Sequence, residues 1–137
     1  MKEEPLHREI VEEHAGNPQF QQKLVSFSHS SRYDSQRTGN ICHIQLLEQD
    51  GAIRGIGCQL QASALATACA SLMACHVRGL PVSKTKLLIK HVLQYVECKE
   101  GTHLPGDLCV YESIRLFKER HDCALLGWRT LRKALES

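Results

Sequence analysis

Two of the seven cysteines stand where a thiol can do chemistry. Cys58 follows the Gly-Ile-Gly at 55–57, where a strand-like run turns into a helix-like one, and Cys123 opens the last helix-like run. A helix N-terminus carries about half a positive charge and unpaired N–H groups. Such a position stabilises a thiolate and lowers its pKa from about 8.5. We therefore expect Cys58 and Cys123 to be nucleophiles or metal ligands, although a small residue that fits a tight turn explains Cys58 equally well.

The other five cysteines are better explained as core or surface residues, since they fall inside predicted helices or a strand. They are Cys42, Cys69, Cys75, Cys98 and Cys109.

Two other kinds of site are weaker interpretations. The glycines at 55–57 suggest a dinucleotide-binding loop, but Leu60 occupies the third glycine position and no parallel βαβ unit surrounds it. A cysteine nucleophile would pair Cys123 with His121 or His29 as base. Such a pair needs a third group to orient the base, and the sequence shows none.

Hydrophobic periodicity indicates the elements that position these thiols. Residues 5–14 have helical spacing and end at Gly-Asn-Pro, 16–18. Residues 23–30 alternate weakly, like a strand, and the stretch SSRYDSQRTGN at 30–40 is polar and loop-like. Residues 41–47 predict a strand that leads through Asp50-Gly51 to a short return strand, as in a hairpin.

An apolar helix is predicted after the hairpin. Residues 59–77 are apolar on nearly every side, which is typical of a helix buried on most of its faces. Gly79 and Pro81 would close it.

Three amphipathic helices are predicted after residue 82. Ser83 would cap the first of them and Asp122 the last. Their ranges are 83–100, 108–120 and 121–137. The order of elements predicts an α+β fold, in which a small antiparallel three-stranded sheet packs against a cluster of helices.

The composition suits one globular domain, residues 1–137. Of the 137 residues, 42% are hydrophobic and 23% charged, enough for one core. A net charge of +2, without a block of Lys and Arg beside aromatic residues, gives no support for nucleic-acid binding. The acidic start is not a signal peptide, and no run of about 18 apolar residues predicts a membrane span.

Seven cysteines are many for a reducing compartment, and their number is odd. Seven cysteines without a CxxC pair fit neither a disulfide framework nor a zinc ribbon. Because the sequence shows neither a signal peptide nor a membrane span, we expect a cytoplasmic protein that binds neither nucleic acid nor membrane.

Segments along the chain resemble, in the same order, the NifU/IscU-type iron–sulfur cluster assembly scaffolds, most closely the SufU branch. HREIVEEHAGNPQF, 7–20, resembles the opening helix and its H-Y-x-N-P element. GIGCQLQASALA resembles G-x-G-C-x-x-x-x-A-S-x-S and gives Cys58 the place of a ligand cysteine. RHDCALLGWRTLRKAL resembles R-x-x-C-A-x-L-x-W-x-A-L-x-x-A-L, with Arg120 and Cys123 in the motif positions. Residues 80–117 resemble the helical insertion of the SufU branch.

The first ligand motif of the family is replaced. Thr38-Gly39-Asn40 aligns with Cys-Gly-Asp, so a hydroxyl stands for a thiolate and an amide for a carboxylate. The resemblance implies that three cysteines and the aspartate hold zinc or a nascent cluster, and zinc takes four ligands. Of these ligands, only Cys58 and Cys123 remain here.

Three residues are candidates to fill the gap: Cys42 and His43, which are nearest in sequence, and His121. Cys42 lies four residues past Thr38, about 13 Å along an extended strand, so it reaches the site only if the strand begins later. His121 lies two residues before Cys123 and would bind if the turn points its ring inward.

The resemblance implies two functions. In the first, the chain receives persulfide sulfur from a cysteine desulfurase, with Cys123 as acceptor and Arg120 as its charge partner. Cys58 and Cys123 would then hold zinc, iron or a nascent iron–sulfur cluster for downstream carrier proteins. In the second, the chain is a metal-free paralogue that acts as an interaction or regulatory protein. Neither is a turnover enzyme.

Overall fold

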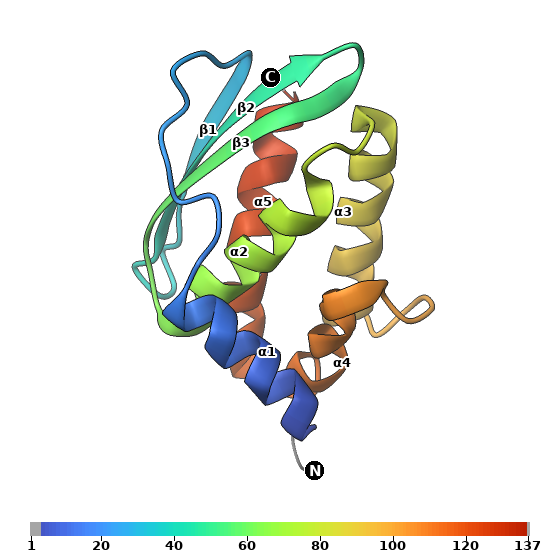
Figure 1. Ribbon diagram of the computed structural model, residues 1–137. Helices are drawn as coiled ribbons and strands as arrows, with labels where there is room; N and C mark the ends of the chain where they lie inside the picture. The colour runs from blue at the N-terminus through green and yellow to red at the C-terminus, as the bar shows by residue number, and fades with distance from the viewer. Residues whose placement is uncertain (1–3, 137) are drawn as a thin grey trace.

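The structure, a computed structural model, describes residues 4–136 as a three-stranded sheet and a group of helices (Figure 1). The elements in chain order are α1 (Pro5–Gly16), β1 (His29–Asp34), β2 (Ile41–Gln49), β3 (Ala52–Gln61), α2 (Ala64–Val77), α3 (Val82–Glu97), the 3-10 helix η1 (Gly106–Val110), α4 (Tyr111–Ile114), the 3-10 helix η2 (Lys118–Arg120) and α5 (His121–Glu136). The sheet order is β1-β2-β3 and both pairings are antiparallel. The predicted α+β fold is confirmed.

Strand alternation decides which side chains enter the core. In β2, Cys42, Ile44 and Leu46 are fully buried, while their neighbours are half-buried. The same face of β3 buries Ile56 and Cys58. Helices α2 and α5 pack against the sheet, α2 mainly on β3 and α5 on β1 and β2. The main core therefore lies between the sheet and these two helices.

The outer edge of β3 is covered by the chain that follows α1. The Cys58 amide donates to the Phe20 carbonyl at 2.8 Å, and Gln22 Nε2 donates to the Ile56 carbonyl at 3.3 Å. This contact needs a glycine at 57, because an added Cβ there would overlap the backbone carbonyl of Gln22.

Helix α2 is buried almost all round, as predicted. It starts at Ala64, where the Ser63 hydroxyl accepts from the Ala66 amide at 3.2 Å, the usual N-cap contact. Its buried residues are Ala66, Ala68, Cys69, Ala70, Ser71, Leu72, Met73, Ala74 and Val77.

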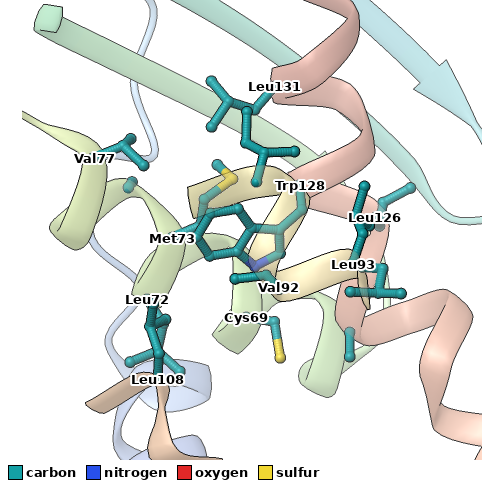
Figure 2. Close-up of a cluster of buried hydrophobic side chains, with 14 of the residues drawn as sticks. Cys69, Leu72, Met73, Val77, Val92, Leu93, Leu108, Leu126, Trp128 and Leu131 are labelled. Atoms are coloured by element: carbon teal, nitrogen blue, oxygen red, sulfur yellow. The ribbon is translucent and has the colours of Figure 1, made fainter. Parts of the chain in front are cut away.

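Helix α5 brings the largest side chain into the core. The Trp128 indole is fully buried among aliphatic residues of α2, α3 and α5 (Figure 2). Its Nε1–H donates to the Tyr111 hydroxyl at 2.7 Å, and the two rings meet edge to face at 6.5 Å between centroids. A buried indole N–H without such a partner would be costly, so this bond ties α4 to α5.

Several predicted boundaries are wrong. The first strand is 29–34, not 23–30. It is an edge strand with a half-exposed pattern, which its polar sequence hides. The return strand runs ten residues to Gln61, so α2 starts five residues later than expected.

The later helices also differ from the prediction. The stretch at 108–120 forms the end of η1, then α4 and η2, and the extended residue Phe117 separates α4 from η2. Pro81, not Ser83, is the N-cap of α3, and no side chain makes a capping hydrogen bond there. Within 4–136, no helix is long and apolar enough to cross a membrane.

The covered edge of β3 can be tested with Gly57→Ala. The added methyl must displace the Gln22 backbone, and such overpacking costs about 1–3 kcal/mol of unfolding free energy. Urea denaturation of the variant measures this loss. Gly16→Ala is the matched control, because a Cβ at Gly16 meets nothing within 4 Å. Equal stability of the two variants would contradict the packing described here.

Candidate functional site

Three segments meet at the start of α5. They are the loop at 35–40 that joins β1 to β2, the residues between β3 and α2, and the first turn of α5. Asn40 connects all three: its Nδ2 donates to Cys123 Sγ at 3.3 Å, and its Oδ1 accepts from the Ser63 amide at 3.0 Å. The structure thus brings Asn40 to Cys123, the pair that the alignment places in one site.

Asp122 holds the same loop from the other side. Its carboxylate accepts from Ser35 Oγ at 2.6 Å, from Thr38 Oγ1 at 3.2 Å and from Arg129 at 3.1 Å. Charged hydrogen bonds of this kind are stronger than neutral ones. Asp122 lies inside the first turn of α5 and not at its N-cap, so the predicted cap is wrong. We call Ser35, Thr38, Asn40, Ser63, Asp122 and Cys123 the polar cluster.

The loop is folded tightly enough to present these side chains. The Gly39 amide donates to the Ser35 carbonyl at 2.9 Å, and the Ser35 amide donates to the Asn40 carbonyl at 2.8 Å. Gly39 has φ +77°, a left-handed conformation that glycine adopts without strain.

Cys58 is not at a helix N-terminus, contrary to the prediction. It lies within β3 opposite Ile44, and only 1% of it is exposed. Burial raises the pKa of its thiol far above the usual range, with the neighbouring Cys42 as a smaller cause. The predicted lowering of its pKa is therefore wrong, because the strand continues through this position and turns the side chain into the core.

The number of residues between Cys58 and the Ala62-Ser63 pair explains why the prediction for Cys58 was wrong. The family pattern has four residues between its cysteine and the Ala-Ser pair, whereas three separate Cys58 from Ala62. Counting back from Ala-Ser would assign the cysteine to Gly57. A shift of one residue along a strand moves a side chain to the opposite face.

Cys42 and the histidines are placed away from the roles considered for them. Cys42 is fully buried in β2, and burial raises its pKa to about 11. A ring nitrogen of His121 bonds the Arg115 carbonyl at 2.9 Å, and His29 bonds Glu48 at 2.9 Å. His43 bonds Ser30. These contacts give no support for a Cys–His nucleophile.

Arg120 lies with its guanidinium over the Phe117 ring, 4.3 Å from the centroid. It also lines a surface pocket with Arg8, Val11, Glu12 and Leu65. Arg120 therefore lies beside the surface of α1 and Leu65 of α2, with its guanidinium stacked on Phe117.

The donors of the polar cluster do not fit zinc or an iron–sulfur cluster. They are three hydroxyls, one amide, one carboxylate and one thiol, whereas zinc and these clusters favour thiolates and imidazoles. Within the described part of the chain, no group of three or more His, Cys, Asp or Glu could hold a metal. The Thr38 and Asn40 side chains bond to protein groups instead.

The burial of the thiols can be tested by alkylation. We expect Cys75 and Cys98, which are exposed, to react with iodoacetamide in the folded protein. Cys42, Cys58 and Cys69 should react only after denaturation. Burial raises the pKa of Cys69 to about 12, and the thiolate is the reacting form. Peptide mapping by mass spectrometry measures each site. Reaction of Cys58 at the rate of Cys75 would contradict its position in the core.

Comparison with known proteins supports the same fold. No protein-family profile and no curated protein sequence matches the chain. Among solved structures, a NifU-like protein (N-terminal) from Brucella abortus matches with TM-score 0.84 and 22% identity, over 93% of this chain and 90% of that one. A protein assigned as an iron–sulfur cluster assembly scaffold for the SUF system, from Fervidobacterium islandicum AW-1, matches with TM-score 0.86 and 18% identity, over 93% and 94%. The chain therefore has the α+β fold of the NifU-like and SufU-type scaffold proteins, as its motifs predicted.

Proposed function

We propose that this chain acts in iron–sulfur cluster assembly as a binding protein for a cysteine desulfurase and does not itself hold zinc or a cluster. The fold shared with a SUF-system scaffold supports the process. The observation that carries the second half is the Asn40–Cys123 hydrogen bond, which occupies two of the positions where the family places ligands.

The polar cluster does by hydrogen bonding what a metal would do by coordination. A metal links segments that are distant in sequence, and its binding energy becomes folding energy. Here Asn40 and Asp122 join the 35–40 loop to α5 through direct contacts between 2.6 and 3.3 Å. The loop can therefore keep its shape, and with it a surface for a partner, without an ion.

We also propose that residues 1–137 form a single domain, because both solved neighbours align with this chain over at least nine-tenths of their own length. It also includes a cytoplasmic location. All seven cysteines are free, and reducing compartments keep thiols in that state.

A second candidate function is sulfur acceptance at Cys123. Cys123 is half-buried and opens α5, whereas Cys42, Cys58 and Cys69 are closed in the core. The Cys123 thiolate would attack the outer sulfur of the desulfurase persulfide, which gives a persulfide on Cys123 and releases the desulfurase thiolate. Arg120 as charge partner of the transferred sulfur remains a prediction, and so does any transfer to downstream carriers.

Metal content tests the second half of the proposal, that the chain holds neither zinc nor a cluster. We expect freshly purified protein to contain well below one zinc or iron per chain by elemental analysis. The double variant Thr38→Cys/Asn40→Asp restores two ligand types beside Cys123, and we expect it to retain more zinc than the parent. One metal per chain in the parent, lost in Cys123→Ser, would contradict the proposal.

Desulfurase binding tests both functions, and sulfur transfer to Cys123 separates them. We expect calorimetry with a purified cysteine desulfurase from the same organism to show binding that Cys123→Ser retains. With cysteine added, mass spectrometry of Cys123 either shows the gain of one sulfur atom or does not. A gain that is absent in Cys123→Ser and present in the control Cys75→Ser supports sulfur acceptance. Absence of desulfurase binding would contradict both functions.

A further inference from the structure

A groove of about 650 Å³ lies between α3 and α5, away from the polar cluster. It is formed by the middle of α3, residues 86–94, and the last turns of α5, residues 132–136. These two helices are neighbours in Figure 1. Arg132 in this groove is nine residues beyond Cys123, about 13 Å along the helix. The groove is therefore a separate surface.

Helical spacing gives the groove an apolar floor and a polar rim. Residues of α3 at spacings of three and four face α5, and α5 contributes the same pattern. The floor is Ile89, Leu93 and Leu135, and the rim is Lys86, Lys90, Gln94, Arg132 and Glu136. The floor residues are at most 8% exposed, so the apolar surface open to an occupant also includes the aliphatic stems of Lys86, Lys90 and Arg132 on the rim.

The rim has an excess of positive charge. It carries three cations and one carboxylate, and that carboxylate, Glu136, lies 4.0 Å from Arg132. Lys86 and Lys90 are one helical turn apart, a like-charge arrangement that disfavours the helix. In the part of the chain that the structure describes, no carboxylate forms an ion pair with either lysine. A negatively charged occupant would relieve this repulsion.

We propose that this groove binds an acidic amphipathic helix of a partner protein. The α3 stripe from Lys86 to Gln94 spans about 12 Å, which matches two turns of a bound helix. Apolar residues of the partner would cover the floor, as in other helix-in-groove contacts, and its carboxylates would meet Lys86, Lys90 and Arg132. The proposal stands apart from the desulfurase proposal and from Cys123.

Fluorescence anisotropy with a designed helix tests the groove. The probe is a labelled amphipathic peptide with leucines on one face and glutamates on both flanks, and its twin carries lysines in place of the glutamates. We expect the acidic peptide to bind the full chain and the basic twin not to bind. Lys86→Glu/Lys90→Glu should weaken binding by about tenfold or more, since facing charges of like sign repel.

The matched control is Lys84→Glu/Lys118→Glu. It makes the same change in net charge at two exposed lysines outside the groove and should keep the affinity within about twofold at moderate salt. If the groove variant gains affinity for the basic twin, it is folded and the charge pairing is established. Equal binding of the twins, equal loss in both double variants, or no binding would overturn the proposal.

Two other occupants would also overturn it. One is a second copy of the chain, seen as a dimer in sedimentation that Lys86→Glu/Lys90→Glu dissociates. The other is an anionic membrane, seen as binding to phosphatidylglycerol vesicles that the same variant abolishes while the acidic peptide has no effect.

Discussion

A helix without a polar face must be covered on every side, and α2 imposes this constraint on the rest of the chain. Burying an apolar side chain contributes about 1.5–3 kcal/mol, so exposing any face of α2 would be costly. Here β3, α5, α1 and η1 each cover part of it. The Ser71 hydroxyl, a buried polar group in α2, bonds His14 and the Gln19 amide at 2.7 Å each. These bonds hold α1 and the chain that follows it against the helix.

The fold was largely predictable because its strongest signals are periodic. The all-round apolar stretch, the Asp50-Gly51 turn and the amphipathic ends predict the α+β layout without reference to any relative. β1 was missed because an edge strand is half-exposed and its sequence is polar. The broken helix at 111–120 was missed because one extended residue, Phe117, interrupts an amphipathic pattern.

The candidate site was predictable only in part. The alignment of TGN brings Asn40 to Cys123, and the hydrogen bond between them agrees with that alignment. The role of Asp122 was misread, since an acidic residue at a helix start suggests a cap, whereas its carboxylate binds the distant Ser35 and Thr38. Cys58 was misplaced because a motif match that is off by one residue assigns the side chain to the wrong face of the strand. The face decides whether the side chain points into the core.

The segment laid along β3 has a consequence for the solution behaviour of the protein. An open strand edge offers unpaired N–H and C=O groups to other chains and is a common start of aggregation. At this edge, Phe20 and Gln22 form hydrogen bonds with backbone groups of β3. Gly57 allows this close approach because it has no side chain. Strand addition at this part of the β3 edge is thus blocked by the chain itself, and β1 is the other edge strand of the sheet.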